Sequence, residues 1–371
     1  MVYNVVKYLT GKDLNMKKLK TAVIGQGRSG RNIHGQFFST DENLYIDVAV
    51  VVELDPARRA LAKEEYPDAE IIADYRELFG RGDIELVVNS TYSNDHYAIT
   101  KELLSNGLNV VVEKPFARSY YECSDLIKTA KDNGVFLAVF QQSFYAPFYV
   151  AAKEVAESGK LGEIKQVSIR YNNFARRWDW QTTQEKMGGG IYNTGPHPIG
   201  IALAFLGFSD DFKVEYSKLG IGMTFGDSDD YAKIILSAPG KPTVDVEVSS
   251  LDAFSDYNIK IQGTRGTYKT KIGEYKMKYI VDGENPEREV VLTSLKDEKG
   301  MPIYCSEKLV AHEEEGSFDG SAFDIGTREF YKRVYAAIRN GEPMEITNED
   351  VAKIIRVIET AHSENPLPKK I

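Results

Sequence analysis

Two residues of this chain lie in settings where they could stabilise charge or move a proton. Lys114 follows an apolar run over 109–112 that predicts a buried strand, and Pro115 comes directly after it. A lysine at that place could donate to a substrate hydroxyl and stabilise developing alkoxide charge. His197 closes a glycine-rich stretch that begins at position 188. Histidine is the usual general base near neutral pH.

Each of the two residues also has a plainer interpretation. Lys114 could form a surface ion pair with its neighbour Glu113. His197 could cap a helix or lie in a core, since a helical pattern follows it through position 206. The chemistry therefore depends on what the rest of the chain brings to these two positions.

A glycine-rich turn near the N-terminus has the G-x-G-x-x-G spacing of a dinucleotide-binding fingerprint. It lies between an apolar run over 21–24 and a helical pattern that extends to about position 39. The first glycine permits the tight turn, the second lets the backbone approach a pyrophosphate, and the third lets helix pack on strand. Free N–H groups at the helix start face the phosphate charge. The turn consists of Gly25, Gln26, Gly27, Arg28, Ser29 and Gly30.

Glu53 supplies the acidic residue of the same fingerprint. A β-rich run over 45–52 ends on it. Its carboxylate would accept hydrogen bonds from the adenosine ribose hydroxyls and would repel a 2′-phosphate. We therefore expect NAD as the cofactor, while Arg58 or Arg59 leaves NADP open because either could pair with a phosphate.

A segment rich in aromatic and arginine residues indicates a ligand with rings and hydroxyl groups. Both tryptophans of the chain lie within 173–180, beside two arginines. Aromatic faces and guanidinium donors suit a sugar-like substrate, and a subunit interface would use the same residue types. The expected substrate residues here are Arg176, Arg177 and Trp178.

The elements that must position these residues fall into two parts. After an extension over 1–17, strands and helices alternate over 18–141, which predicts a doubly wound parallel sheet with its ligand at the carboxyl ends of the strands. Residues 142–371 contain mostly alternating β-branched and aromatic runs, which predict an α+β domain with a large antiparallel sheet. Helices are expected over 322–339 and 348–362, the latter at the domain junction.

The polar segment 282–320 reads as loops, and its charge run at 312–315 reads as a solvated face rather than a metal site. We therefore expect no bound metal.

Composition narrows the function classes further. The 371 residues have a net charge of −9 and a pI near 5.3, which argue against nucleic-acid and anionic-membrane partners. Two cysteines, Cys123 and Cys305, provide neither a disulfide framework nor metal-ligand spacing, so a reducing cytoplasm fits. No apolar run approaches membrane-spanning length, and the N-terminus lacks the pattern of a signal peptide.

The motifs together resemble the glucose–fructose oxidoreductase/inositol dehydrogenase (Gfo/Idh/MocA) family. They are the glycine turn, the Glu-Lys-Pro sequence at 113–115, and the triple glycine that leads to His197. The likeness extends over nearly the whole chain from position 18 and includes Thr91 and His96. It implies an open antiparallel sheet in the second domain, whose face often forms the oligomer contact. A homo-oligomer, dimer or tetramer, is therefore expected.

The resemblance also implies roles for single residues. Lys114 matches the family's catalytic lysine and His197 its catalytic histidine. Asn193 stands where the family usually has aspartate, so it would orient His197 without charging it. Tyr192 is similar to a tyrosine of the NADP-dependent scyllo-inositol dehydrogenases and could bond the same hydroxyl or relay the proton. Gln141, where asparagine is common, would hold the carboxamide end of the cofactor.

The sequence thus predicts an NAD(P)-dependent oxidoreductase that transfers hydride between nicotinamide and a secondary alcohol of a sugar, inositol or related polyol. Two alternatives stay open: a glycoside hydrolase or lyase with tightly held NAD in an internal redox cycle, and a non-catalytic dinucleotide-binding sugar sensor. The expected cofactor contacts are Gly25, Gln26, Gly27, Arg28, Ser29, Gly30, Glu53, Thr91, His96, Glu113, Lys114 and Gln141.

Overall fold

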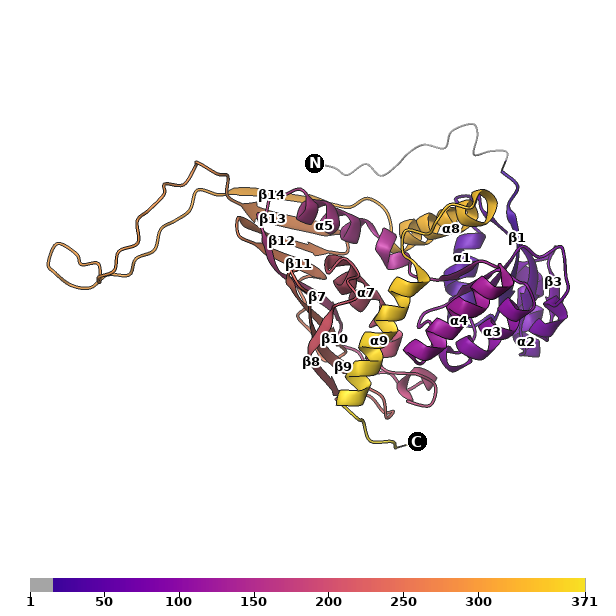
Figure 1. Ribbon diagram of the computed structural model, residues 1–371. Helices are drawn as coiled ribbons and strands as arrows, with labels where there is room; N and C mark the ends of the chain where they lie inside the picture. Colours follow the sequence, from indigo (N-terminus) through magenta and orange to yellow (C-terminus); the bar gives the residue numbers. More distant parts are fainter. Residues whose placement is uncertain (1–15, 371) are drawn as a thin grey trace.

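The computed structural model describes residues 16–370 and contains two sheets, each with its own helices (Figure 1). The first is a six-stranded parallel sheet in the order β3-β2-β1-β4-β5-β6. Helices cover both faces, so its strands are mostly apolar. The doubly wound fold class is confirmed. The strands are β1 (Leu19–Ile24), β2 (Ile46–Val52), β3 (Glu70–Ile72), β4 (Leu86–Asn89), β5 (Val110–Val112) and β6 (Leu137–Val139).

Two helices of this part begin at a side chain that accepts from their first N–H groups. Asp55 caps α2 (Pro56–Glu65), Ser119 caps α4 (Tyr120–Asn133), and a short helix η4 (Ser93–Asp95) leads into α3 (His96–Ser105). The capping box at Asp74 opens only one 3-10 turn, η3 (Tyr75–Leu78). The helix expected over 31–39 is instead a π-helix, η2 (Gly30–Gly35), followed by the short α1 (Gln36–Phe38).

The second sheet has eight strands in the order β14-β13-β12-β11-β7-β10-β9-β8. All neighbouring pairs are antiparallel except β7 and β10, so the predicted large, mostly antiparallel sheet is confirmed. The strands are β7 (Ile164–Asn172), β8 (Lys213–Gly220), β9 (Tyr231–Ser237), β10 (Thr243–Ser249), β11 (Ile259–Gly263), β12 (Gly266–Lys271), β13 (Glu274–Tyr279) and β14 (His312–Ser317).

One strand was predicted wrongly as loop. β14 carries the charge run at 312–315 and pairs with β13 at the edge of the sheet. Glu313 and Glu315 form ion pairs with Lys278 and Lys276 on the neighbouring strand. Opposite charges that face each other across two paired strands stabilise the pairing. A strand of this kind lacks the alternating apolar residues by which strands are usually predicted.

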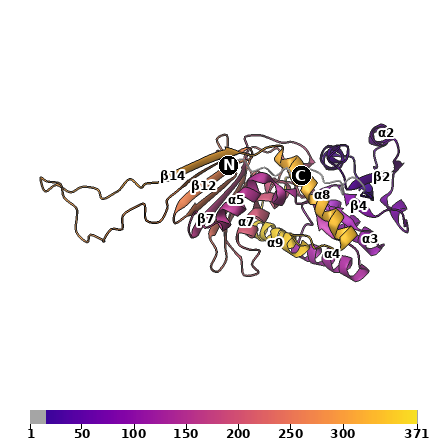
Figure 2. The ribbon, with the colours of Figure 1, turned by 90° about the horizontal axis from the view of Figure 1, so that it is seen from above.

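Helices cover only one face of this second sheet (Figure 2). They are α5 (Pro147–Glu157), α7 (Pro196–Phe205) and α9 (Asn348–Glu364). α9 also packs against α4 and β6 of the first part, so it lies between the two sheets. α8 (Ala322–Asn340) returns to the first sheet, where Phe330 and Tyr331 join its core. No helix within 16–370 has the length and apolar character needed to cross a membrane.

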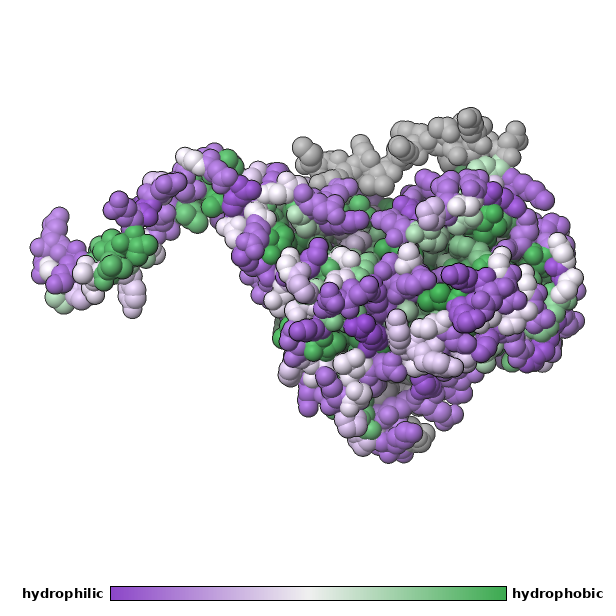
Figure 3. Space-filling view, viewed as in Figure 1, coloured by the Kyte–Doolittle hydropathy of each residue, from purple (hydrophilic) through white to green (hydrophobic). Residues whose placement is uncertain are grey.

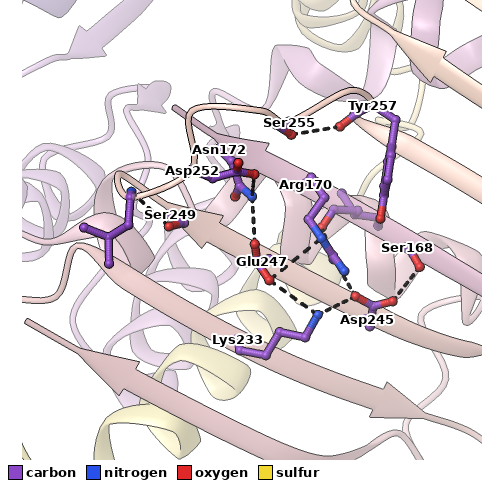
Figure 4. A network of polar contacts seen from close by, with 12 residues as sticks. Ser168, Arg170, Asn172, Lys233, Asp245, Glu247, Ser249, Asp252, Ser255 and Tyr257 are labelled. Carbon is purple, nitrogen blue, oxygen red and sulfur yellow. Dashed lines mark hydrogen bonds and ion pairs between the residues drawn. The ribbon is translucent and has the colours of Figure 1, made fainter. Parts of the chain in front are cut away.

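The uncovered face of the second sheet carries a network of charged side chains (Figure 4). The Asp245 carboxylate accepts from the Ser168 hydroxyl at 2.5 Å and from Lys233 Nζ at 2.6 Å, and it is paired with Arg170. Burial opposes the charge, but these donors lower the pKa of Asp245 to about 2. The Glu247 carboxylate lies 3.7 Å from Lys233 Nζ. The network therefore contains two carboxylates, Asp245 and Glu247, for the two cations Lys233 and Arg170.

Replacing Asp245 with alanine should destabilise the protein by about 3 kcal/mol, because two largely buried cations lose their main partner. Lys276→Ala is the matched control, since it removes one exposed pair from the same face and should leave the unfolding free energy unchanged. Denaturant unfolding of the two variants measures the difference. Equal stability of Asp245→Ala and wild type would show that the network contributes nothing net.

Candidate active site

A cleft of about 630 Å³ runs along the carboxyl ends of the first sheet's strands. One end is lined by Leu54, Arg58 and Tyr75, and the other by Lys114 and Asn193. Parallel strands present their ligands at this edge. The second part of the chain contributes a wall made of Arg177, Asp179, Trp180 and Gln181.

The glycine turn forms the floor of the cleft, with a different constraint at each glycine. Gly25 has a φ of +89°, which only glycine adopts readily. A Cβ on Gly30 would lie 1.8 Å from the carbonyl oxygen of Gly25, so a side chain there is excluded. A Cβ on Gly27 would meet no atom within 4 Å, and Gly27 lines the cleft. This open backbone before a helix start is a cradle that fits a pyrophosphate.

Glu53 is held in place by backbone groups around it. Its carboxylate accepts from the N–H of Gln26 at 2.7 Å and from the N–H of Asp55 at 2.9 Å, and it is 7% exposed. Arg58 Nη1 lies 4.0 Å away. The carboxylate therefore lies at the β2 end of the cleft, attached to the turn whose backbone it fixes.

Glu113 and His96 fix the loops below the reactive end. Glu113 lies 3.1 Å from His34 Nε2 and accepts from the backbone N–H of Lys114 at 3.0 Å. Burial opposes ionisation, but the bond and charge of His34 lower the pKa of Glu113 to about 2. His96 contacts the carbonyls of Pro115 at 2.8 Å and Thr91 at 3.3 Å, and burial lowers its pKa. His96 thus joins the loops after β4 and β5.

Lys114 reaches from β5 across the cleft to the second part of the chain. Its Nζ donates to the carbonyl oxygen of Asn193 at 2.8 Å. Burial lowers the pKa of this ammonium, with Arg28 and Arg177 adding to the effect. A lysine with a lowered pKa that faces a cleft can donate to a bound oxygen and exchange a proton with it.

His197 lies in the first turn of α7 and is not among the residues that line the cleft. Its Nδ1 is 3.1 Å from the Ser143 hydroxyl, and its ring stacks on Tyr171 with centroids 6.5 Å apart. Burial and the Lys114 charge lower the pKa of His197 to about 3. The imidazole is therefore neutral at physiological pH. Its Nε2 has no hydrogen-bond partner among residues 16–370.

Two expected contacts of this region are wrong. The Asn193 side chain does not hold His197, because its Oδ1 accepts from Gln181 Nε2 at 3.0 Å while Ser143 contacts the histidine. Tyr192 does not face the cleft either. Its hydroxyl donates to the Arg118 carbonyl at 2.9 Å, and its ring stacks on His362. These partners occupy Tyr192 in the packing beneath α6 (Gly190–Asn193).

Gln141 has unsatisfied polar atoms that fit a cofactor amide. The side chain is 3% exposed, and neither its nitrogen nor its oxygen has a hydrogen-bond partner in the described part of the chain. It lies just beyond β6 and before η5 (Gln142–Tyr145), which carries Ser143. Buried amides normally find partners. Gln141 is not among the residues that line the cleft, which include Lys114.

The predicted substrate residues separate into two environments. Arg177 lines the cleft and is paired with Asp179 at 2.5 Å. Arg176 instead lies over the Phe225 ring at 4.3 Å, and Trp178 is 79% exposed, outside the cleft lining. Sequence reasoning overlooked Trp180, which packs edge-on against Tyr92 at 4.8 Å and lines the cleft with it. Its place beside the predicted arginines was the available signal.

Asp229 is a second overlooked residue, and it positions the Asn193 carbonyl. Its carboxylate accepts from the N–H of Ile191 at 2.8 Å, at the start of α6, the short helix that ends at Asn193. Burial raises the pKa of Asp229 to about 7. A Cβ on Gly189 would lie 2.2 Å from Asp229 Oδ1, so the glycine run leaves the room that this carboxyl occupies.

The residues lining the cleft contain no ready metal site, since no group of three or more His, Cys, Asp or Glu side chains within 16–370 could hold an ion. The fold and the cleft together define a dinucleotide-binding protein with a separate substrate-side domain. The profile for an oxidoreductase family with an NAD-binding Rossmann fold matches residues 19–141, and that for the GFO/IDH/MocA C-terminal domain matches residues 149–269. The chain belongs to the Gfo/Idh/MocA family of oxidoreductases.

Several relatives are similar over most of the chain. An uncharacterized oxidoreductase of Schizosaccharomyces pombe is 29% identical over 68% of this chain and 70% of its own. The scyllo-inositol 2-dehydrogenase (NADP(+)) of Bacillus subtilis is 22% identical over 92% of both chains. The 2,7-anhydro-N-acetylneuraminate hydratase of Mediterraneibacter gnavus is 24% identical over 78% of this chain and 77% of its own.

Two solved structures have the same fold. A putative oxidoreductase from Bacteroides fragilis is 28% identical with a TM-score of 0.70, covering 94% of this chain and 97% of its own. A protein of gentamicin A biosynthesis, solved in complex with NAD, superposes with a TM-score of 0.73 over 94% of both chains, at 20% identity.

Asp229→Asn tests the positioning role through pH. The raised pKa in the folded state means that wild type holds a proton there that the unfolded chain has lost, so its stability falls as pH rises from about 4 towards 7. An asparagine side chain can still accept from the N–H of Ile191 but cannot ionise. The variant should therefore lack this part of the fall in stability with rising pH. Denaturant unfolding from pH 5 to pH 8 should show its stability rising relative to wild type. Parallel curves would mean that Asp229 is ionised in the folded protein.

Proposed function

We propose that this protein catalyses the reversible, NAD-dependent oxidation of a secondary alcohol on a sugar, inositol or related polyol. The observation that carries the proposal is Lys114, which has a lowered pKa and lines the same cleft as the glycine cradle. The scyllo-inositol 2-dehydrogenase supports the substrate class, as a relative over nearly the whole chain.

The cofactor would extend from Glu53 to Lys114. The backbone at Gly27 would hold the pyrophosphate, Glu53 the adenosine ribose, and Gln141 the carboxamide. When bound, the nicotinamide supplies the acceptor for a hydride. The remaining chemistry belongs to residues that bind the alcohol and remove its proton.

Lys114 and His197 would divide that work. The Lys114 ammonium would donate to the substrate oxygen and stabilise its developing negative charge. His197 is neutral, so its Nε2 can accept the hydroxyl proton once Nδ1–H donates to Ser143. Arg177 and Trp180 supply a cation and an aromatic face for the rest of a polyol.

One relative favours a second candidate. A hydratase at 24% identity indicates that this family includes reactions without net oxidation, which fits tightly held NAD in an internal redox cycle. A panel of sugars, inositols and glycosides with NAD or NADP, followed by nicotinamide absorbance and product analysis, separates the two. The proposal expects reduced cofactor to accumulate in step with a ketone product. Product without any change in absorbance would favour the cycle, and no turnover with any compound would favour a sensor.

Cofactor preference should follow Glu53. A nearly buried carboxylate beside the ribose repels a 2′-phosphate, so kcat/KM should be higher with NAD than with NADP. Glu53→Gln removes the charge while keeping the shape of the side chain. It should lower the ratio of kcat/KM with NAD to kcat/KM with NADP. A wild type that prefers NADP would mean that Arg58 dominates the site.

Lys114→Met keeps much of the side-chain length and removes the ammonium. Turnover should fall by about 10²-fold or more, the scale for losing one preorganised donor. NAD affinity, measured by calorimetric titration, should change much less because the cradle lies elsewhere. An equal loss of NAD binding would make Lys114 a cofactor contact rather than a catalytic group.

His197→Ala should lower turnover by about 10²–10⁴-fold if the imidazole is the general base. The low pKa predicts that wild-type kcat/KM shows no acidic limb from His197 down to about pH 5. Asn193→Asp adds a negative charge at the end of α6, just before α7, whose first turn contains His197. This charge favours the imidazolium, so an acidic limb should emerge at higher pH. A His197→Ala variant within a few-fold of wild type would place the base elsewhere, with Lys114 the next residue to test.

A further inference from the structure

Residues 282–311, between β13 and β14, form a long arm that projects from the edge of the second sheet (Figure 1). Figure 2 shows, from a second direction, that the arm points away from the first sheet. Its two limbs are paired at several points, including Ile303 N–H to the Leu295 carbonyl at 2.9 Å and Val310 N–H to Asn285 at 2.8 Å. The arm is therefore a long loop whose two limbs touch at a few points, including one isolated β-bridge between Lys296 and Pro302.

The arm carries large apolar side chains that this chain does not cover. Val290, Leu292 and Tyr304 are 86%, 93% and 101% exposed, and Met301 and Ile303 are exposed beside them. Figure 3 shows the corresponding green patches along the arm. Apolar groups gathered on a surface mark an interaction site.

A second set of exposed apolar side chains lies on segments next to those that line the cleft. We call it the mouth patch: Phe174, Trp178, Phe225, Leu251 and Phe254, all exposed. Phe174 and Leu251 form an isolated β-bridge, and the Arg176 guanidinium lies over Phe225. The segment with Phe174 and Trp178 continues directly into Arg177 and Trp180, which line the cleft.

Charge and length indicate that the arm and the mouth patch fit each other. The arm has seven acidic and four basic residues. Glu287 and Glu289, just before Val290, have no ion pair within the described residues, and Arg176 in the mouth patch has no carboxylate partner there either. A limb such as 282–296 can span roughly 50 Å when extended, enough to cross a neighbouring domain. Since each arm points away from its own first sheet, at whose edge the cleft lies, the patch it can reach belongs to another copy.

We propose that the arm of one copy of this chain docks on the mouth patch of a second copy, and that the exchange is reciprocal. A reciprocal exchange closes a two-fold dimer and leaves neither surface exposed. The partner's arm then walls off the mouth of the cleft, so each substrate site is completed by the other subunit. The identity of that cleft rests on the proposed function, whereas the docking itself does not.

Cys305 allows a direct test, because it lies next to Tyr304 on the arm and is exposed. The other cysteine, Cys123, is buried, and burial raises the pKa of its thiol, so a maleimide will react at Cys305. A benzophenone maleimide attached there is photolysed in an equal mixture of unlabelled and heavy-nitrogen protein. Mass spectrometry of the digest then identifies the joined peptides. Mixed-isotope peptides that join Cys305 to 173–180 or 250–256 are expected.

Crosslinks confined to one isotope, crosslinks to any other surface, or a monomer by sedimentation at micromolar concentration would each overturn the proposal. Leu292→Ser with Tyr304→Ser should weaken self-association by about tenfold or more, since buried apolar anchors dominate interfaces. Lys299→Ser at the arm tip is the matched control and should leave it unchanged. Both variants should melt like wild type, because the arm lies outside either core. Unchanged self-association of the double variant would also contradict the proposal. None of these measurements needs turnover, so failure of the proposed activity would leave them interpretable.

Discussion

The contact on which this structure depends most is the hydrogen bond from Lys114 Nζ to the Asn193 carbonyl. It joins the end of a Rossmann strand to the glycine-rich turn of the second domain, and it places an ammonium in the cleft. Both partners are fixed from behind. Glu113 and His34 hold the lysine loop, and Asp229 holds the helix that presents the carbonyl. The two domains thus build one reactive end, although each has its own sheet.

Burial around this contact determines the protonation states that the chemistry needs. It lowers the pKa of Lys114 and of His197. The site therefore holds an ammonium that loses its proton more readily than a free lysine, together with a neutral imidazole. Asn193 adds no charge, and its Oδ1 accepts from Gln181. The negative charge next to Lys114 therefore comes from Glu113 rather than from position 193.

Much of the fold could be predicted because its signals are local. The helix Pro147–Glu157 has an apolar stripe and a proline at its start, and the strands of the first sheet are short runs of valine. The elements that were predicted wrongly depend on partners far along the chain. β14 is a strand because Lys276 and Lys278 face its glutamates, and a sequence pattern of consecutive charges does not reveal that. The arm belongs to the same polar segment. Its sequence resembles that of an ordinary loop, so the projecting arm was not predicted.

The residues of the site also fall into two groups, those whose placement the sequence predicts and those whose placement it does not. The glycine turn, Glu53 and Lys114 follow from backbone position, so their placement along one cleft could be expected. Tyr192 and the Asn193 side chain could not, because adjacent residues on a short helix point in different directions and their partners, Arg118 and Gln181, are distant in sequence. Asp229 could not be predicted for the same reason. Its carboxylate accepts a single hydrogen bond from α6, donated by the backbone N–H of Ile191, which lies far from it in sequence.

The central claim is that Lys114 and His197 assist direct hydride loss from an alcohol carbon to the cofactor. The most direct measurement uses the best polyol from the substrate panel with deuterium on its carbinol carbons, and follows the label by mass spectrometry. The account predicts reduced cofactor that carries one deuterium, formed in step with ketone, and a strongly slowed reaction in Lys114→Met. Product formed while the deuterium stays on the sugar or exchanges with water, with no labelled cofactor released, would contradict it.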